Sequence, residues 1–249
     1  MARVRSVAEP DLDSPVLVEG LPGVGLVGKI TTDHLVDTFE MEYVASIECD
    51  GVPRVAIYDA DDHDVLPPVR LYADESRDLL ALQSDVPVTR QASVDFSACF
   101  TEWLASQNAT PLYLSGLPVE DHDPETLPDV FGVATSDTAA ERLRDHDIPT
   151  PPERGLIGGP TGALVNRAAE NGVDATGLVV ESDPQFPDPA AAKRLIDAAV
   201  EPLADVDVPT DELVDRAEEI RDQKERLAKR MQEASQEEST QARPMRMFQ

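Results

Sequence analysis

The chain has 249 residues and a net charge of −28 at neutral pH, because 49 acidic residues face only 21 basic ones. A chain of this length can bury a large hydrophobic core. The charge argues against a nucleic-acid or anionic-membrane surface, since either would need a basic patch.

The choice of charged residues is unusual. Only 4 basic residues are Lys and 17 are Arg, while Asp outnumbers Glu by 28 to 21. The acidic residues are scattered through every segment, and hydrophobic residues still make up 41% of the chain, which argues against general disorder. We therefore expect a haloarchaeal cytosolic protein whose carboxylates keep its surface hydrated in concentrated salt.

The two cysteines, Cys49 and Cys99, do not have the spacing of a zinc site or of a disulfide framework. We expect both to be buried, reduced thiols. The first residues contain no apolar stretch typical of a signal peptide, and no run of about 18 apolar residues occurs. The sequence thus predicts a soluble, cytoplasmic protein.

The sequence up to about residue 147 predicts several strands and only three helices. Residues 14–20 form a short apolar run typical of a buried strand, and residues 24–39 follow with helical periodicity. Helices are also predicted over 90–107 and 138–147. The further strand-like runs are 43–49, 54–60, 69–73, 78–84, 111–117 and 130–136.

The opening pattern recurs over residues 154–172, which predict a strand, a Gly-rich turn and a helix ended by Gly172. A strand over 176–182 follows, and then a helix with Asp188 as its N-cap and Pro189 at its first position. Alternating strands and helices predict an α/β fold, a three-layer α/β/α sandwich. The consecutive strands in the middle predict that its central sheet is mixed.

The chain changes character after Val208, so we expect an α/β/α domain over 1–208. Thr210 is placed to cap a long C-terminal helix over 209–236, in which apolar residues recur every three or four positions. This narrow, coiled-coil-like seam could pack on a partner helix or on its own domain. Residues 237–249 are predicted to be a flexible tail. The seam consists of Leu213, Ala217, Ile220, Lys224, Leu227, Met231 and Ala234.

Residues 20–29, GLPGVGLVGK, match two nucleotide-binding patterns. Gly23, Gly28 and Lys29 have P-loop spacing, but a P-loop needs a Ser or Thr hydroxyl directly after the Lys to bind magnesium. Ile30 occupies that position. On a helix Thr31 would be rotated about 100° away from the metal, so we do not expect a P-loop.

Gly23, Gly25 and Gly28 also match a dinucleotide-binding turn, with Glu48 as the candidate ribose-binding acid. Pro22, however, stands directly before the first glycine, and the apolar helix that follows leaves few amides free for a pyrophosphate. We favour the alternative that these glycines let the helix pack closely on the sheet.

Other catalytic and metal-binding arrangements are not evident. His34 falls on an apolar helix face, and His63, His122 and His146 lie in acidic loop-like stretches. The acidic run 59–64 lacks the Gly and Glu of a calcium loop, and is more typical of a solvated surface. We therefore expect no catalytic residue, no metal and no cofactor.

Three segments together resemble the archaeal branch of the proteasome assembly chaperone family: residues 16–36, 155–182 and 187–203. The resemblance implies a fold like that of purine nucleoside phosphorylases, a homo-oligomer, no enzymatic activity, and binding to the α subunits or α ring of the 20S proteasome. The family's Gly-rich motifs fall here on Gly23, Gly25, Gly28, Gly158, Gly159 and Gly162.

Some archaeal relatives dock on the proteasome through a C-terminal tail that ends in a hydrophobic residue, tyrosine and any residue. The last residues here are Met247, Phe248 and Gln249, so the aromatic ring is retained without its hydroxyl. The resemblance therefore implies docking through these three residues.

An alternative function belongs to a different class. The phosphorylase-like fold and the helix N-termini beside the Gly-rich turns, which favour anions, would suit a nucleotide or nucleoside. The candidate contacts of such a small-molecule binder or enzyme are Lys29, Thr161 and Glu181.

Overall fold

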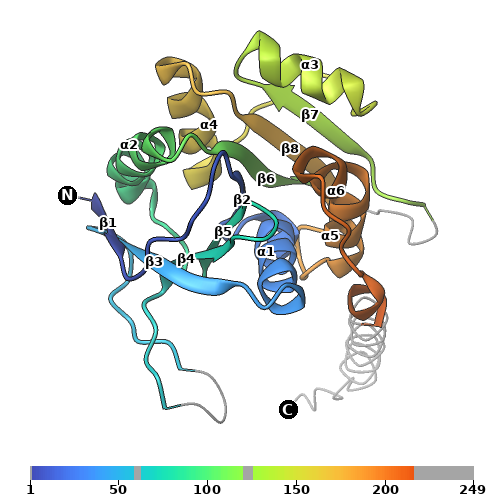
Figure 1. Ribbon diagram of the computed structural model, residues 1–249. Helices are drawn as coiled ribbons and strands as arrows, with labels where there is room; N and C mark the ends of the chain where they lie inside the picture. Colours follow the sequence, from blue (N-terminus) through green and yellow to red (C-terminus); the bar gives the residue numbers. More distant parts are fainter. Residues whose placement is uncertain (1, 59–62, 120–125, 216–249) are drawn as a thin grey trace, which may run out of the picture.

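A computed structural model describes residues 2–58, 63–119 and 126–215 (Figure 1). Within these residues one sheet contains eight strands in the order β1-β3-β4-β5-β2-β6-β8-β7. The strands are β1 (Ala2–Ser6), β2 (Val16–Gly20), β3 (Glu42–Cys49), β4 (Val69–Asp74), β5 (Leu79–Ser84), β6 (Thr110–Pro118), β7 (Val130–Ala134) and β8 (Thr176–Ser182).

The sheet is mixed, as the sequence predicts. Strands β5, β2, β6 and β8 are parallel neighbours at its centre. Strands β1, β3 and β4 extend one side in antiparallel pairs, and β7 closes the other side antiparallel to β8. The carboxyl ends of the four central strands therefore meet along one edge, which is where α/β proteins usually bind ligands.

Helices cover both faces of the sheet (Figure 1). Alternate residues of β2 divide between the two cores: Val18 packs with the first set of helices and Leu17 with the second. The first set is α1 (Val27–Thr38), α3 (Asp137–Asp145), α5 (Pro189–Leu195) and α6 (Glu201–Ala204), with a π-helical turn over Ile196–Val200 between the last two. The second set is α2 (Arg90–Ser106) and α4 (Gly159–Asn171).

Two helix ends are formed as their sequence signals predict. The Asp188 side chain accepts a hydrogen bond of 3.0 Å from the Ala191 backbone N–H, and so caps α5. Gly172 ends α4 in the left-handed conformation, at φ 67°, which a glycine adopts without strain. Both signals are local, so neither depends on the tertiary fold.

The predicted helix over 24–39 is interrupted near its start. Residues Val24–Leu26 form a 3-10 turn in which Gly25 has φ 60°. Leu26 follows with φ 52°, and regular α-helix begins only at Val27. The Gly-rich segment is therefore a turn in front of the helix.

Two predicted strands are wrong and one strand is unforeseen. Of the predicted strand over 54–60 the structure describes residues 54–58, and among these only Ile57 pairs, by bridging Leu66. Both edges of β3 are already taken by β1 and β4. Residues 154–158 have no regular structure before α4 begins at Gly159. Strand β1 was not predicted, since the polar stretch Ala2–Ser6 has little hydrophobic alternation.

The described chain ends just after a helix begins at residues 211–215. The rest of the predicted helix over 209–236, most of its seam, and the tail over 237–249 lie outside the described residues. Among the helices that the structure does describe, none combines the length and the apolar character needed to cross a membrane.

Candidate functional site

The Gly-rich turn between β2 and α1 fills the place where a ligand would be expected. A Cβ atom added at Gly25 would lie 1.9 Å from the Ser182 Oγ at the end of β8. One added at Gly116 in β6 would lie 2.5 Å from the Val24 carbonyl oxygen. The Gly25 carbonyl also accepts a hydrogen bond of 2.8 Å from the Asp188 N–H. The turn therefore packs directly onto the carboxyl ends of β6 and β8.

The other motif glycines differ in what surrounds them. A Cβ at Gly28 would lie 3.4 Å from both Gly20 Cα and Leu114 Cβ, and one at Gly162 only 2.1 Å from the Ile157 carbonyl oxygen. Gly159 has φ 65° but open space around it. The nearest atoms to a Cβ at Gly23 and at Gly158 would be 4.0 and 3.8 Å away. Close packing thus explains the glycines at positions 28 and 162, and the positive φ angle explains the one at position 159.

Gly20, outside the predicted set, is the most crowded glycine of this region. A Cβ there would lie 1.8 Å from the Thr32 Oγ1 of α1. Thr32 itself is fully buried. In the sequence Gly20 is simply the last residue of the apolar run 14–20. Nothing there distinguishes its close packing from that of the neighbouring glycines.

Glu19 places a fully buried carboxyl group beneath the turn. Its Oε1 accepts hydrogen bonds of 3.0 Å from the Leu21 N–H and from the Thr161 hydroxyl, and its Oε2 accepts one of 3.2 Å from the Leu114 N–H. Burial raises the pKa of Glu19 to about 8, against the opposing effect of these donors. Glu19 is not among the predicted site residues, because one acid at the end of a strand carries no motif.

Lys29 belongs to a closed network of charges on the α1 side of the sheet. Its ammonium group lies 2.8 Å from Asp33 and 3.0 Å from Asp85, and the Arg70 guanidinium lies 2.8 Å from Asp85. Gln83 completes the network by donating to Asp33 at 2.7 Å and accepting from Arg70 at 2.6 Å. Two cations and two carboxylates therefore compensate one another.

The pKa shifts in this network agree with that compensation. Burial alone would lower the pKa of Lys29, but the bonds and charges of Asp33 and Asp85 raise it above its usual value. Burial also opposes ionisation of Asp85, and Lys29 and Arg70 nevertheless hold its pKa below the usual value. Lys29 and Asp85 thus remain ionised at neutral pH, already paired within the chain.

The candidate contacts for a small molecule do not converge. Lys29 lies on α1 and Thr161 on α4, and these helices cover opposite faces of the sheet. The Glu181 carboxylate accepts a hydrogen bond of 3.1 Å from the Asp129 N–H and so holds the start of β7. Glu48 lies on β3, which is separated from β2 by β4 and β5, and pairs with Arg3. The geometry therefore does not support a dinucleotide site.

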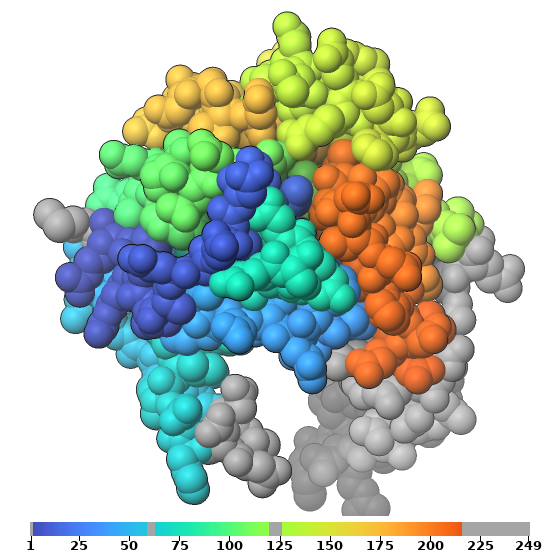
Figure 2. All heavy atoms as spheres, viewed as in Figure 1, coloured from blue at the N-terminus to red at the C-terminus, as the bar shows by residue number. Residues whose placement is uncertain are grey.

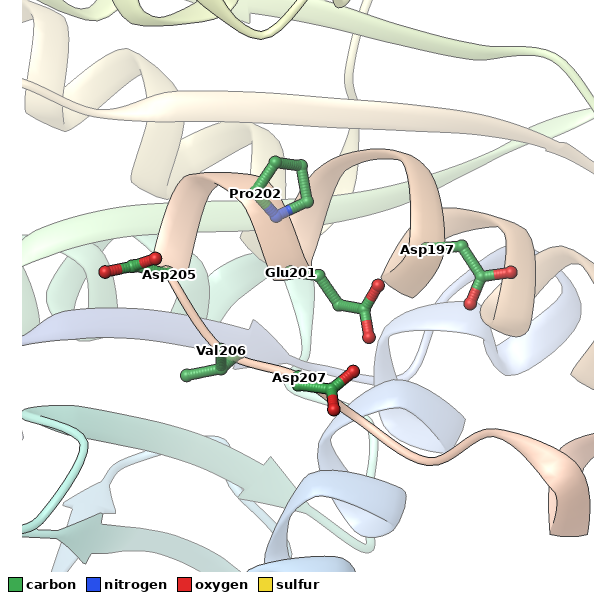
Figure 3. Close-up of a pocket in the computed structure, with 6 residues that line it drawn as sticks. All are labelled: Asp197, Glu201, Pro202, Asp205, Val206 and Asp207. Atoms are coloured by element: carbon green, nitrogen blue, oxygen red, sulfur yellow. The ribbon is translucent and has the colours of Figure 1, made fainter.

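A hollow of about 530 Å³ lies beside the last described helices (Figure 3). Its lining is acidic, but Asp197 lies 2.6 Å from the Lys193 ammonium, and Glu201 accepts a hydrogen bond of 2.7 Å from the Val208 N–H. Among the described residues no group of three or more His, Cys, Asp or Glu side chains could hold a metal ion. The remaining lining residues are Pro202, Asp205, Val206 and Asp207.

Residues 208–213, which we call the C-terminal root, are fixed to the body by several contacts. His34 Nε2 lies 2.7 Å from the Pro209 carbonyl oxygen and, because a carbonyl only accepts, must carry the hydrogen. The Lys193 ammonium donates to the Thr210 hydroxyl at 2.8 Å, and Leu213 is fully buried. His34 was expected on an apolar face and is 2% exposed. Its polar partner, a distant backbone carbonyl, leaves no trace in the sequence.

The residues predicted to contact a partner, Met247, Phe248 and Gln249, lie outside the described residues. The root lies just before the end of the described chain at residue 215. Cys49 and Cys99 are both free and half-buried, and burial raises the pKa of each thiol.

Comparison with known proteins places the whole described core within one family. Residues 17–228 match the PAC2 family. Two uncharacterized proteins of Methanocaldococcus jannaschii are 27% and 26% identical to this chain. The alignments cover 89% and 83% of this chain and 88% and 80% of the relatives.

Solved structures show the same fold at low sequence identity. Pyrococcus furiosus PbaA, an archaeal homolog of proteasome-assembly chaperone, matches with a TM-score of 0.78 and 22% identity, over 96% of this chain and 97% of PbaA. Pyrococcus furiosus PbaB, an archaeal proteasome activator, matches with a TM-score of 0.75 and 20% identity, over 91% of this chain and 98% of PbaB.

Proposed function

Because the chain belongs to the PAC2 family, we propose that it is a non-enzymatic protein that binds the 20S proteasome, either as an assembly chaperone or as a tail-docking regulator or adaptor. The observation that carries the proposal is this family match over residues 17–228. The descriptions of PbaA and PbaB, which share the fold, direct it towards the proteasome.

The geometry of the Gly-rich region supports a scaffold rather than a catalyst. The turn fills the crevice at the carboxyl ends of the central strands, where Gly25 packs against Ser182. Lys29, the only lysine of the motif, is engaged by two carboxylates. A catalytic site needs a concave space with polar groups directed into it, whereas the described polar groups of this region, Glu19 and Lys29, bond to groups within the chain.

The proposed contact with the proteasome is the C-terminal tripeptide. Met247 and Phe248 would enter apolar pockets between neighbouring α-ring subunits, and each would contribute about 1.5–3 kcal/mol if fully buried. The Gln249 carboxylate would pair with a lysine of the pocket. In molar salt the screening length is about 3 Å, so the apolar contacts would dominate.

A single tail of this kind would bind weakly, so we propose that the protein acts as a homo-oligomer. Several tails on one particle gain on the order of 10² to 10⁴ in avidity without any new contact. If the predicted helix continues to residue 236, residues 216–236 extend about 32 Å at about 1.5 Å per residue, and the 13-residue tail adds up to about 45 Å when extended. Since the root at residues 208–213 is fixed, each copy would release its tail from the same point on its own surface.

The decisive experiment is capture of purified 20S particles in molar KCl by the full-length chain and by a chain lacking residues 247–249. We expect the truncation and Phe248→Ala each to abolish capture, and Met245→Ala, an apolar change outside the tripeptide, to leave it intact. Equal capture by the full and truncated chains would reject tail docking alone. If no form captured either the particle or purified α subunits, the proteasome role itself would be wrong.

A further inference from the structure

Strands β6 and β8 continue beyond the end of β2 and extend the sheet at its carboxyl edge. Glu19, near the end of β2, is opposite Tyr113 of β6, and Tyr113 is opposite Gly177 of β8. From these positions β6 runs five residues further to Pro118, and β8 runs five residues further to Ser182. The extension is therefore roughly 16 Å long, and β7 flanks it on the side of β8.

The two faces of the extension are covered differently. On one face the Gly-rich turn packs onto Gly116 of β6 and Ser182 of β8. Side chains alternate along a strand, and Leu114 belongs to the hydrophobic core on that same face. Leu117 and Val179 therefore point to the opposite face, which α4 covers nearer the middle of the sheet.

Helix α4 and the segment before it cover that opposite face at the level of Gly177. A Cβ atom added at Gly177 would lie 3.2 Å from the Ile157 Cδ1 and 3.6 Å from the Val165 Cγ2. Further along the extension, Val179 is opposite Phe131 of β7. Neither of these two belongs to the hydrophobic cores that the described residues form, so this end of the face lies outside both cores.

Exposed leucines gather around this end of the face. Leu117, Leu127 and Leu156 are 41%, 73% and 90% exposed, and no other leucine within the described ranges is exposed. Leu117 is opposite Glu181 in the sheet. Leu127 lies two residues before Asp129, whose N–H bonds the Glu181 carboxylate. Two of the three leucines therefore border the same carboxylate.

The third leucine, Leu156, lies beside the start of α4. It is the nearest neighbour that a Cβ at Gly158 would meet, at 3.8 Å, and Gly159 has open space around it. The start of α4 has no side-chain cap, and a helix start favours a carboxylate. We call the surface beside it the leucine face, which consists of Leu117, Leu127, Phe131, Leu156 and Val179.

The leucine face is small. An exposed apolar patch on an ordinary monomer covers about 300–600 Å², whereas a stable interface between two proteins takes about 800 Å² from each partner. A patch around three leucines therefore suits a short apolar segment better than a second folded domain. A segment tethered to the same chain also needs only weak contacts, because its effective concentration is on the order of millimolar.

The C-terminal end of the chain is a segment of this kind. Its last five residues include Met245, Met247 and Phe248, and Gln249 follows with the terminal carboxylate. Three large apolar side chains match the leucines, and the carboxylate matches the uncapped start of α4 beside them.

Charge favours a contact between this segment and the body. Residues 216–249 hold 8 basic and 7 acidic residues, whereas residues 1–215 hold 13 basic and 42 acidic ones. The last part of the chain is therefore attracted to the rest of it. Glu181 points to the same face of the sheet as Val179, so its carboxylate would meet Arg246, which lies between the two methionines.

The chain is long enough to reach its own leucine face. The C-terminal root lies at the surface beside α1, in dark orange in Figures 1 and 2. A folded body of about 215 residues has a radius of gyration of about 17 Å and is roughly 45 Å across. Residues 216–249, as a helix to residue 236 and an extended tail, span up to about 77 Å.

We propose that residues 245–249 rest on the leucine face of their own chain, with the apolar side chains on the leucines and the terminal carboxylate at the start of α4. The leucine face and the α ring then compete for the same residues, and the resting contact holds the tail back. This competition rests on the proposed tail docking, but the contact itself forms in the isolated protein.

Methyl-labelled methionine tests the contact directly, because the chain has only five methionines. In molar KCl the NMR signals of Met245 and Met247 in the full-length protein should differ from those of a synthetic peptide of residues 241–249. Leu117→Thr with Leu156→Thr should move them to the peptide positions. Val94→Thr, at a side chain that is 70% exposed on α2, should not. The signal of Met41, buried in the first core, shows whether each variant is folded.

A mixed sample shows whose face the tail occupies. The labelled double variant is mixed with an unlabelled chain that lacks residues 245–249, so that the only intact leucine face belongs to another molecule. The tail signals should stay at the peptide positions. A return to the wild-type positions would overturn the contact within one chain. Wild-type signals that already coincide with the peptide would overturn the contact altogether and leave the proteasome proposal standing.

Capture of the 20S particle tests the competition. If nine tails in ten rest on the leucine face, their release in the double variant should strengthen apparent binding to the particle about tenfold. Equal capture by wild type and double variant would overturn the competition. Absence of capture by every form would reject tail docking, while the NMR result on the isolated protein would still decide the contact.

Discussion

The Thr161 hydroxyl donates a hydrogen bond of 3.0 Å to the buried Glu19 carboxyl group, and this contact joins the two Gly-rich motifs. Glu19 lies at the end of β2, directly before the first motif, and Thr161 lies in the first turn of α4, within the second. The Leu21 N–H bonds the same carboxyl oxygen. Segments that resemble ligand-binding loops are therefore tied to each other inside the protein.

Glu19 should make stability depend on pH. Its folded-state pKa of about 8 exceeds its usual 4.5, so the folded chain retains a proton that the unfolded chain has lost. The free energy of unfolding should be highest below pH 4.5 as far as this group is concerned. It should then fall as the pH rises towards 8, by at most about 1.4 kcal/mol per pH unit.

Glu19→Gln isolates that contribution, because a glutamine of similar shape does not titrate. We expect denaturant unfolding of wild type at pH 5, 7 and 9 to show a loss of stability that the variant lacks. Thr161→Val serves as the companion, since it removes one donor and keeps the titrating group. A wild-type and variant pair with parallel pH profiles would show that Glu19 does not carry a raised pKa.

Gly25 and Gly159 form a matched pair for testing the Gly-rich turn. Both have positive φ, at 60° and 65°, but only Gly25 has an atom within contact of an added Cβ, the Ser182 Oγ at 1.9 Å. Gly159→Ala should cost about 1–2 kcal/mol of unfolding free energy from backbone strain. Gly25→Ala should cost about 1–3 kcal/mol more from overpacking. Equal losses in denaturant unfolding would mean that the turn is not pressed onto β8.

Signals confined to a few neighbouring residues predicted much of this fold. The Asp188 cap and the Gly172 helix end are formed by contacts within a single helical turn. The apolar run of β2 predicts a buried strand from its composition alone. The interpretation of the Gly-rich stretch as close packing agrees with the contacts at Gly28 and Gly162. These features follow from local sterics and hydrogen bonding, which the sequence states directly.

The remainder depends on which segments meet. Residues 54–60 have the composition of a strand, but no edge of β3 is available to pair with them. The pairing of Lys29 with Asp85 spans 56 positions, and that of His34 with Pro209 spans 175. One sequence does not reveal such distances. From the sequence alone, Lys29, Thr161 and Glu181 could therefore be assigned to one ligand site. In the structure they do not lie together.

Asp85 should be the critical member of the charge network, because it faces both Lys29 and Arg70. Asp85→Asn leaves the Arg70 side chain, which is 5% exposed, without its carboxylate, and should cost about 3 kcal/mol. Glu48→Gln breaks an exposed pair with Arg3 and should cost under about 1 kcal/mol. Denaturant unfolding in the same salt compares them, and equal losses would contradict a buried network.

The lowered pKa of Asp85 sets the direction of its pH effect. Its ionised form stabilises the fold fully above its usual value of 3.8, and this contribution is lost as the pH falls through its lower folded-state value. Wild type should therefore lose stability below about pH 4 more steeply than Asp85→Asn. Parallel acid unfolding curves would count against the network as the cause.

The C-terminal root offers a test that separates positioning from stability. His34→Ala removes the donor to the Pro209 carbonyl, and Lys193→Met removes the donor to the Thr210 hydroxyl, while the buried Leu213 remains. Together they should raise amide hydrogen exchange at residues 210–215 roughly tenfold or more, the effect of losing hydrogen bonds of ordinary strength. Exchange in the central strands should not change.

His34→Gln, which keeps an N–H donor on a side chain of similar reach, should restore part of the protection. If a fixed root is what directs the tails, the double variant should capture the 20S particle less well than wild type at equal folded concentration. Faster exchange with undiminished capture would show that the root is held for stability alone.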